Sequence, residues 1–355
     1  MLLRRARTLL VAWREPQLVL MNYRRRVAVG AGPEAVRVLH FFDDWKPPSA
    51  LCLALPEYDR KSLLAGIRQL QANSFLIAQG TRDAELDEEL AREWSAWLPY
   101  ASFHFATKDT LFLSPSKAER LMRRYVAESP QPPLVKSYPQ ASRVPLPPAR
   151  PSGDEFTRVL MARTTYREYS RKSLPLDAVS TLLYYTWGVM GKLDAPPFGQ
   201  LFHKTSPSGG ARHPGEVYLL ALRVDGLPQG LYHYDGVHHR LEHLRSVPAK
   251  KKAVSYAAGQ EWLRDASAVF LMTAVFPRTM WKYRFARAYR VVMLDAGHLC
   301  QTFCLVATWL GLAPFCTAAL KDSEIEKDLG IDGVRESVLY LAAVGTPVVS
   351  SRNKR

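Results

Sequence analysis

The feature that most constrains this chain is a proline-dense segment at residues 129–151. It holds eight of the 25 prolines in the 355-residue sequence. Proline lacks an amide hydrogen and has a fixed φ, so such a density excludes a helix or a central strand and favours extended backbone. We therefore predict a linker over residues 129–152, between an N-terminal domain (1–128) and a C-terminal domain (153–355).

Composition places the chain among ordinary globular proteins, because 47% of its residues are hydrophobic and 23% are charged. Its formal net charge of +15 permits two interpretations. One is a basic, solvated surface, and the other is attraction to an acidic partner such as nucleic acid, a leader peptide or a phosphate-bearing cofactor. Net charge alone does not decide between them.

Two segments bear on location. The apolar stretch in Met1–Trp13 is interrupted by arginines and is too short for a secretory signal. The longest apolar region, Val291–Phe315, includes Asp295, His298 and Gln301, which predicts a buried helix rather than a membrane span. We expect a cytoplasmic protein.

The chain has four cysteines, Cys52, Cys300, Cys304 and Cys316, and no Cys-x-x-Cys pair. A helix would place Cys300 and Cys304 one turn apart, which is half of a metal-binding pattern. No second pair completes it, so we expect buried thiols, no metal ion and no disulfide framework.

The hydrophobic pattern of the N-terminal domain alternates short strands with small helices. Leu18–Val29 predicts a strand pair and Phe75–Ala78 another strand, while Glu34–Phe42 and Tyr58–Gln71 carry apolar residues at helical spacing. This combination predicts a small winged-helix-like α+β module, a class that binds nucleic acid or peptides or only packs on a neighbour. We expect the aromatic segment Trp94–Thr110 to dock on an apolar surface.

The C-terminal domain predicts an α+β fold. Asp154 is a candidate N-cap of a first helix with apolar residues at 156, 159 and 160. The other expected elements are helices at Leu176–Met190 and Arg284–Leu310, buried strands at Val217–Val224, Ala268–Val275 and Ser337–Val344, and a hairpin of Gly230–Tyr234 with Arg240–Leu244.

Four clusters of polar or small residues carry the chemistry, and the first is the Pro-Ser-Gly-Gly turn at 207–210. It is followed by Arg212 and His213 and then by an apolar strand. Glycines let backbone amides approach a ligand closely, and a hydroxyl beside an arginine suits a phosphorylated ligand. The alternative is an ordinary turn.

The second cluster is Arg163-Thr164-Thr165-Tyr166-Arg167. Two guanidinium groups four residues apart, with two hydroxyls between them, can surround one phosphate. The alternative is a solvated basic end of a helix.

The third cluster, Trp281-Lys282-Tyr283-Arg284, stands with Arg287 at the entry to the most apolar helix. Lys282 or Tyr283 is a candidate proton-transfer group, provided that its surroundings lower a pKa that is ordinarily about 10. The alternative is that the aliphatic parts of these lysine and arginine side chains only cover apolar surface. The fourth cluster, Gly311–Ala319, is an extended run of small residues that permits close approach to a flat ring system, or only links a helix to a strand.

Taken in their order along the chain, the four clusters resemble the motifs of the flavin-dependent nitroreductase superfamily. Within it they are most similar to the SagB-type dehydrogenases, the azoline oxidases of thiazole- and oxazole-modified peptide biosynthesis. The resemblance extends from about Phe156 to Pro347, and the N-terminal domain resembles the front domain of the same enzymes. Its pattern over Leu18–Ala78 is similar to the PqqD-like peptide-recognition fold, and the segment 94–109 matches that front domain more closely. The matching motifs are Pro-Ser-Gly-Gly-Ala-Arg-His-Pro-Gly-Glu-Val-Tyr (207–218), Gly-Leu-Pro-Gln-Gly-Leu-Tyr-His-Tyr (226–234), Lys-Tyr with Arg-Ala-Tyr-Arg (282–290), Asp-Ala-Gly-His-Leu-Cys-Gln (295–301), Leu-Gly-Ile-Asp-Gly (329–333) and Tyr-Leu-Ala-Ala-Val-Gly-Thr-Pro (340–347).

The resemblance implies a nitroreductase-like FMN fold, in which an antiparallel-rich central sheet is flanked by helices, and a homodimer with FMN at its interface. It implies Lys282 and Tyr283 as the catalytic pair, and a 207–209 turn that contacts the FMN of the dimer partner. The implied FMN-binding residues are Arg163, Thr164, Thr165, Arg167, Pro207, Ser208, Gly209, Gly210, Arg287, Pro314, Phe315, Cys316 and Arg352. Two departures stand out: Thr165 replaces the commoner serine, and Pro-Phe-Cys-Thr-Ala (314–318) replaces a Pro-Ile-Gly-Gly-like segment.

We therefore expect an FMN-dependent oxidase or dehydrogenase that converts a thiazoline or oxazoline ring to a thiazole or oxazole. Its substrate would be a ribosomal or carrier-bound peptide, and a cyclodehydratase its partner. One alternative is an NAD(P)H-dependent, nitroreductase-like reductase of small molecules. Another is a winged-helix binding protein with an inactive flavin domain. Glu57 and Asp59, which oppose Arg60, Lys61 and Arg68, argue against nucleic acid as its ligand.

Overall fold

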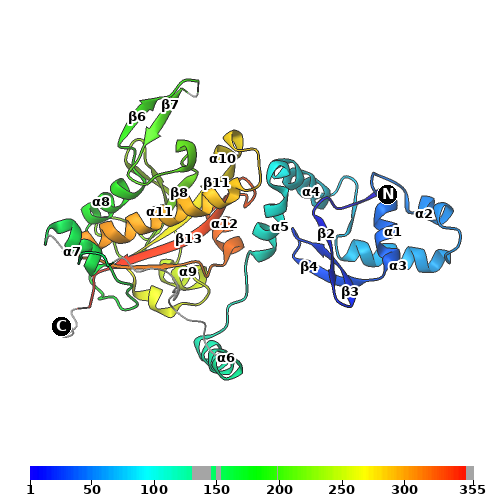
Figure 1. Cartoon of the computed structure of the whole chain (residues 1–355), viewed down its shortest axis with the longest axis horizontal. Helices are drawn as coiled ribbons and strands as arrows, with labels where there is room; N and C mark the ends of the chain where they lie inside the picture. Colours follow the sequence, from blue (N-terminus) through cyan, green and yellow to red (C-terminus); the bar gives the residue numbers. More distant parts are fainter. Residues whose placement is uncertain (130–144, 149–152, 198, 349–355) are drawn as a thin grey trace.

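The computed structural model describes residues 1–129, 145–148, 153–197 and 199–348 (Figure 1). Most of the expected linker and Arg352 therefore lie outside the described residues, and the domain boundary at 129–152 stays a prediction. The described chain forms a smaller N-terminal part and a larger C-terminal part, each built from both strands and helices. The expected α+β class is confirmed.

The C-terminal part is organised around a six-stranded sheet in which every neighbouring pair is antiparallel. Its central strand β11 occupies the predicted range Ala268–Val275, and its first seven residues are buried because helices cover both faces. In spatial order the strands are β10 (Arg240–Arg245), β9 (Gly230–Asp235), β8 (Gly215–Ala221), β11, β13 (Glu336–Gly345) and β12 (Ala313–Thr317).

Two pairs of helices cover this sheet (Figure 1). On one face lie α8 (Leu176–Trp187) and α11 (Ala288–Trp309), and Trp187 and Phe303 pack there against Phe270 of β11. On the other face lie α9 (Ala249–Tyr256) and α12 (Asp322–Leu329), whose buried residues share a core with the opposite side chains of β8, β11 and β13. The remaining elements of this part are α7 (Glu155–Ala162), α10 (Phe276–Lys282), the hairpin β6 (Gly191–Asp194) and β7 (Gln200–His203), and the 3-10 helices η2 (Gly209–Ala211) and η3 (Glu261–Asp265).

Three details differ from the sequence expectations. Leu176, the first apolar residue of the helix expected at 176–190, is 42% exposed because it stands at the first residue of α8. Helix α7 begins with the expected Asp154 cap, but it buries none of its residues, and Phe156 is 67% exposed. Helix α11 begins at Ala288 instead of Arg284, since residues 283–287 form an irregular turn.

By length and composition α11 could cross a membrane, yet it is the helix that packs on the central sheet. It is buried on that side only. Leu294 and Trp309 remain 62% and 44% exposed. The sequence expectation of a buried helix is therefore correct for one face of α11.

The N-terminal part packs three helices and a strand pair against a three-stranded sheet. Leu20, Phe42, Ile67 and Phe75 are central members of its core. The predicted strands and helices near residues 18–78 are all present. The elements are β1 (Leu3–Arg5) paired with β5 (Leu76–Ala78), the sheet β2 (Leu9–Arg14), β3 (Gln17–Asn22) and β4 (Val27–Ala31), and α1 (Pro33–Phe41), α2 (Pro48–Ala54) and α3 (Arg60–Ala72), followed by α4 (Arg82–Glu93), η1 (Ser95–Trp97), α5 (Leu98–Thr107) and α6 (Pro115–Glu128).

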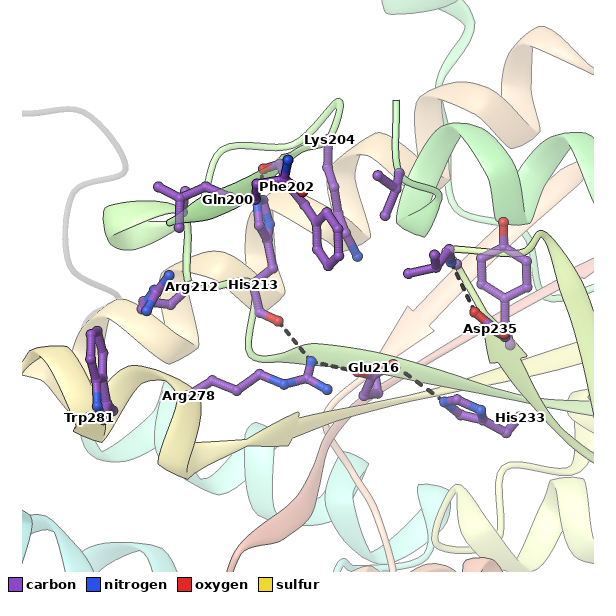
Figure 2. A pocket seen from close by; sticks show the side chains of 16 residues that line it. Gln200, Phe202, Lys204, Arg212, His213, Glu216, His233, Asp235, Arg278 and Trp281 are labelled. Atoms are coloured by element: carbon purple, nitrogen blue, oxygen red, sulfur yellow. Dashed lines mark hydrogen bonds and ion pairs between the residues drawn. The ribbon is translucent and has the colours of Figure 1, made fainter. Parts of the chain in front are cut away.

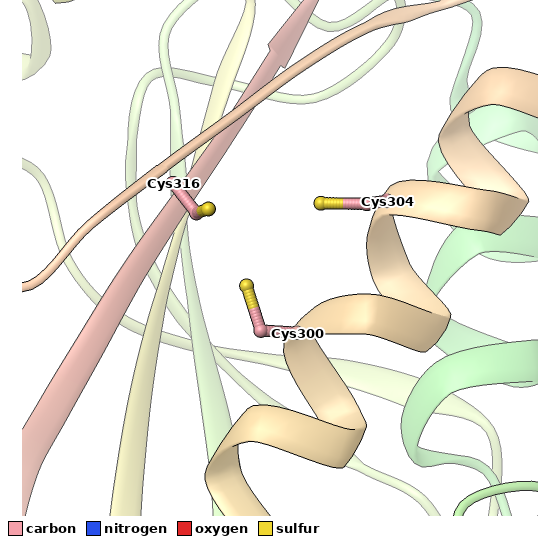
Figure 3. Close-up of side chains that lie close together, drawn as sticks. All are labelled: Cys300, Cys304 and Cys316. Atoms are coloured by element: carbon pink, nitrogen blue, oxygen red, sulfur yellow. The ribbon is translucent and has the colours of Figure 1, made fainter. Parts of the chain in front are cut away.

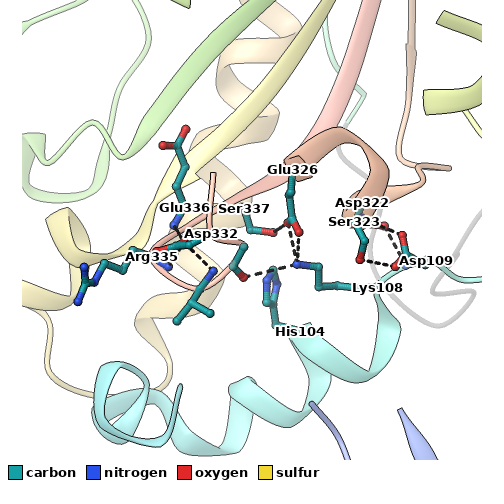
Figure 4. Close-up of polar contacts among 12 residues, drawn as sticks. His104, Lys108, Asp109, Asp322, Ser323, Glu326, Asp332, Arg335, Glu336 and Ser337 are labelled. Carbon is teal, nitrogen blue, oxygen red and sulfur yellow. Dashed lines mark hydrogen bonds and ion pairs between the residues drawn. The ribbon is translucent and has the colours of Figure 1, made fainter. Parts of the chain in front are cut away.

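The segment from α4 to α5 joins the two parts. His104 Nδ1 lies 3.0 Å from Tyr289 Oη, and Lys108 forms an ion pair with Glu326 in which both side chains are at most 10% exposed (Figure 4). Trp94 is completely buried among aromatic rings from both parts. The expectation that this aromatic segment docks on an apolar surface is confirmed.

Candidate functional site

The Pro-Ser-Gly-Gly turn is held by a buried carboxylate of α11. Ser208 Oγ donates to Asp295 Oδ2 at 2.6 Å and Gly209 N donates to Oδ1 at 3.3 Å, while His213 N donates to Ser208 Oγ at 2.9 Å. Asp295 is 5% exposed, and burial raises its pKa. Asp295 was absent from the expected site residues, although the matching motif 295–301 begins with it.

The same turn lies against the expected catalytic pair. Gly210 adopts a φ of +62°, and a Cβ added there would stand 2.5 Å from Tyr283 Oη and 2.7 Å from Lys282 Nζ. Glycine is required at this position by both its conformation and its surroundings. The structure thus brings together two clusters that are distant in the sequence.

Tyr283 is also held from the N-terminal part. It follows the last residue of α10, and its backbone carbonyl accepts a hydrogen bond of 3.0 Å from Trp97 Nε1. The Trp97 side chain is completely buried. Lys282 Nζ lies 5.5 Å from the centroid of the Tyr283 ring, so both members of the pair are positioned by one short segment.

A cavity of about 510 Å³ is lined by residues next to this pair in the chain, and Figure 2 shows its lining side chains. Ala211 and Trp281, the neighbours of Gly210 and Lys282 in the chain, form part of its wall. The ring of Phe202, from the β6–β7 hairpin, lines another side. The cavity therefore adjoins the expected catalytic residues and can accept a substrate of moderate size.

One wall of the cavity contains a connected set of charges. Glu216 forms an ion pair with Arg278 at 2.5 Å, and His233 Nε2 lies 3.4 Å from its carboxylate. The hydrogen bond to Glu216 raises the pKa of His233 to about 9. Arg278 also donates to the carbonyl of His213 at 3.0 Å, which links the wall to the turn.

Two further cations of the cavity have no carboxylate within ion-pair distance among the described residues: Lys204 and Arg212. Burial lowers the pKa of Lys204. The Arg212 guanidinium lies 5.2 Å from the Trp281 ring centroid, and its buried Nε has no hydrogen-bond partner. Unmatched cations and an unpartnered donor make this side of the cavity suitable for an anionic group.

The 163–167 cluster lies elsewhere, beside strand β12. Tyr166 N donates to the Pro314 carbonyl at 2.9 Å, and the Arg167 guanidinium lies 5.7 Å from the ring centroid of Phe315. The hydroxyl-bearing Thr164 and Thr165 are exposed. Two arginines and two accessible hydroxyls in one place fit a phosphate. Phe315 is only 3% exposed, so its ring belongs to the core.

The two groups of expected residues stand at opposite ends of α11. Val291 contacts the turn at Gly209, whereas Arg163 lies close enough to Cys304 and Cys316 to act on them electrostatically. Thirteen helical residues separate Val291 from Cys304, which is about 20 Å along the axis. Arg287 is exposed at the first end. Within one chain, the 163–167 cluster, which fits a phosphate, therefore does not adjoin the Gly210 turn with Lys282 and Tyr283.

Comparison with known proteins gives a consistent result. A profile of the nitroreductase family matches residues 160–346. Trifolitoxin-processing protein TfxB of Rhizobium leguminosarum bv. trifolii is 33% identical over 170 residues, which are 47% of this chain and 46% of TfxB. Protein MJ1384 of Methanocaldococcus jannaschii, named a nitroreductase, is 32% identical over 54% of this chain and 90% of its own length.

A solved structure extends the likeness in fold. One chain of the E. coli microcin synthetase McbBCD complex aligns with a TM-score of 0.53 at 22% identity, covering 74% of this chain and 97% of that chain. The coverage exceeds the C-terminal part alone, so the shared fold includes some of the N-terminal part. The present chain spans slightly less than half the length of TfxB.

Proposed function

Because this chain belongs to the nitroreductase family, we propose that it is an FMN-dependent oxidoreductase that oxidises thiazoline or oxazoline rings of a peptide to thiazoles or oxazoles. The observation that carries the proposal is the position of Lys282 and Tyr283, whose polar atoms meet at the Gly210 turn beside a cavity. Two titratable groups at this place are suited to proton transfer. The similarity to TfxB, a trifolitoxin-processing protein, supports a peptide substrate.

Two groups of residues in this chain fit two different portions of FMN, its phosphate and its ring system. Arg163 and Arg167, with Thr164 and Thr165, would hold the phosphate, and the backbone of β12 at Pro314 would border them. Gly210 lies directly against the catalytic pair, because an added Cβ would stand 2.5 Å from Tyr283 Oη and 2.7 Å from Lys282 Nζ. Its backbone, which carries no side chain, would let the ring system approach that pair. When bound, FMN supplies a two-electron acceptor for hydride.

Lys282 and Tyr283 supply the other part of the reaction. Aromatisation of an azoline removes one hydride and one proton from the ring, so a base has to accept that proton. The neutral Lys282 amine or the Tyr283 phenolate would accept it, and the segment that carries both is oriented by α10 and by the Trp97 hydrogen bond. Lys204 and Arg212 would bind an anionic group of the substrate within the cavity.

A second copy of the chain would complete each site. The Gly210 turn lies near Val291 and the 163–167 cluster lies on the side of Cys304, and these two residues are about 20 Å apart along α11. The phosphate cluster of one copy would therefore serve the Gly210 turn of the other. An exposed apolar groove of about 430 Å³ between α7, α8 and α11 includes Phe156, Tyr185 and Trp309. Exposed apolar surface of this kind favours burial in an interface.

The N-terminal part would bind the substrate peptide. Strand β4 is an edge of its three-stranded sheet, and a mainly apolar groove of about 410 Å³ runs between β4 and α3. A peptide can add to such an edge as a further strand, with alternate side chains directed into the groove. The rings to be oxidised would then lie elsewhere in the same peptide. A cyclodehydratase that forms these rings in the cytoplasm would be the partner.

The proposal is tested with purified protein loaded with FMN and a synthetic thiazoline-bearing peptide in air. Mass spectrometry should show a product lighter by two hydrogens. Lys282→Ala and Tyr283→Phe should retain the flavin absorbance and lower turnover by roughly 100-fold or more for the residue that is the base. A protein that binds no FMN, or turnover that survives both substitutions, would contradict the proposal.

A reductase of small molecules is the second candidate, favoured by the similarity to MJ1384 over 90% of that protein. In this case the unmatched Lys204 and Arg212 would contact a phosphate of NAD(P)H. NADPH-driven reduction of a nitroaromatic compound distinguishes the two. Fast reduction together with inert azoline peptides would select the second candidate.

A further inference from the structure

Three of the four cysteines converge where helix α11 faces strand β12 (Figure 3). Cys300 and Cys304 stand one turn apart on the helix, and Cys316 points toward them from the strand. Their three Sγ atoms lie within 4.8 Å of one another. Cys300 and Cys304 are 4% and 7% exposed, so the cluster is largely shielded from water.

A thiophilic metal ion would need little rearrangement to enter this cluster. Zn–S bonds of about 2.3 Å place sulfurs that share one ion about 3.8–4.0 Å apart. The backbone of α11 fixes two of the donors, and pairing of Cys316 with Ala342 of β13 fixes the third. Three thiols held by rigid elements form a preorganised site, and thiolates select Zn²⁺ and Cu⁺ over hard cations.

Two neighbouring side chains match the needs of such a site. Tyr340 Oη donates a hydrogen bond of 3.4 Å to Cys316 Sγ, a contact of the kind that orients a metal ligand. The Arg163 guanidinium is near enough to Cys304 and Cys316 to act on them electrostatically, which would offset the negative charge of three thiolates. The described part of the chain adds no further histidine, cysteine or carboxylate to the group, so a fourth position would be open.

We propose that Cys300, Cys304 and Cys316 bind one thiophilic metal ion, Zn²⁺ or Cu⁺, which ties β12 to α11. The sequence pattern showed only the helical half of this site, and the fold supplies Cys316. Strand β12 also accepts the hydrogen bond from Tyr166 at Pro314, so the ion would stabilise the segment that borders the 163–167 cluster. The role is structural, and it does not depend on the proposed oxidase reaction.

The test uses the full chain, reduced and stripped of metal with a chelator, then given Zn²⁺ or Cu⁺ in separate anaerobic arms. We expect elemental mass spectrometry to find one ion per chain. The bound ion should also protect three thiols from a thiol reagent, and adding the chelator should abolish that protection. Co²⁺ in place of Zn²⁺ should give the intense near-ultraviolet absorption of thiolate coordination in the unmutated protein. The arm with the tighter binding identifies the ion.

Cys304→Ala and Cys316→Ala should weaken binding by roughly 100-fold or more, whereas Cys52→Ser, at the fourth cysteine in α2, should bind as the unmutated protein does. Circular dichroism of the metal-free variants separates loss of ligand from loss of fold. No bound ion in any arm, equal binding by Cys304→Ala and Cys52→Ser, or a chain isolated two hydrogens lighter because two of these thiols form a disulfide would overturn the proposal.

Discussion

The indole Nε1 of Trp97 donates a hydrogen bond to the backbone carbonyl of Tyr283 at a distance of 3.0 Å. The two residues belong to different parts of the chain, and the donor is completely buried. The segment that carries the expected catalytic pair is therefore fixed by the N-terminal part. This contact makes that part a component of the candidate site.

Trp97→Phe keeps an aromatic ring but removes this hydrogen bond. Leaving a buried carbonyl without its donor should lower the free energy of unfolding by about 1–3 kcal/mol. Turnover should fall roughly three- to tenfold because Tyr283 is less well positioned, with FMN content unchanged. Trp94→Phe is a matched control: it removes a 3.0 Å bond to the Val334 carbonyl and should lower stability similarly without changing turnover. Equal turnover loss in both variants would show that Trp97 acts only through stability.

Gly210→Ala should disturb the catalytic pair directly. The added Cβ would stand 2.5 Å from Tyr283 Oη, so the turn or the tyrosine has to move. A displacement of about 1 Å near reacting groups can lower a rate by roughly 100-fold. Gly80→Ala is the control, because Gly80 also has a positive φ, +75°, but nothing lies within 4 Å of its added Cβ. Steady-state kinetics and thermal unfolding of both variants separate strain from local displacement.

Copies with different defects should complement each other if two chains build each site. Arg163→Ala and Lys282→Ala are each expected to be inactive. Random exchange of subunits makes half of the dimers mixed. Each mixed dimer has both defects in one site and neither in the other. Activity should therefore return to roughly a quarter of the unmutated level. Activity is measured after denaturation and joint refolding of the two variants. No recovery, despite a dimer by light scattering, would place both residues in the site of one chain.

Gly66 allows the groove between β4 and α3, the proposed peptide site, to be closed without altering the core. It lies in α3 and lines the groove, and nothing is within 4 Å of an added Cβ. Gly66→Ala should be neutral or stabilising by about 1 kcal/mol, as alanine favours a helix, whereas Gly66→Trp should fill the groove. We expect Gly66→Trp to raise the KM for a full-length peptide roughly tenfold or more and to spare short azoline substrates. An unchanged KM would exclude the groove as the peptide site.

The free energy of unfolding should decline between about pH 7 and pH 9 because of His233. Its pKa in the folded protein is raised to about 9 by hydrogen bonds to Glu216 and Glu242, against about 6.5 in an unfolded chain. The folded state therefore binds more protons in this window, and the stabilisation, complete below pH 6.5, is lost as the pH rises through 9. His233→Gln should remove this part of the decline. Urea unfolding at each pH measures it, and identical slopes for both proteins would refute the assignment.

Local patterns in the sequence predicted much of the fold. The range of β11 is correct because all its residues except Thr273 are apolar, and the β9–β10 hairpin follows from Asp235-Gly236 between the two segments that form its strands. The expected start of α11 was wrong because residues 284–287, Arg-Phe-Ala-Arg, continue the helical composition while forming a turn. Periodicity reports which residues share a face, and it does not report where an irregular turn ends.

The candidate site was predictable only in parts. The Gly210 turn and Lys282 were visible as motifs, but their contact is formed by packing of residues distant in the sequence. Asp295 and Trp97 gave no separate signal, since a carboxylate in an apolar helix and one tryptophan among several have many other uses. The third thiol of the cysteine cluster became evident only once β12 was paired with β13.

The docked aromatic segment determines where this chain can be cut and rejoined. A fragment that started in the proline-rich region would leave Phe276 and Tyr289 uncovered and Glu326 without Lys108. Chimeras built to test whether the N-terminal groove selects the peptide should therefore join ahead of Trp94, so that the grafted module brings a new groove while the host keeps the aromatic residues that dock on its C-terminal part.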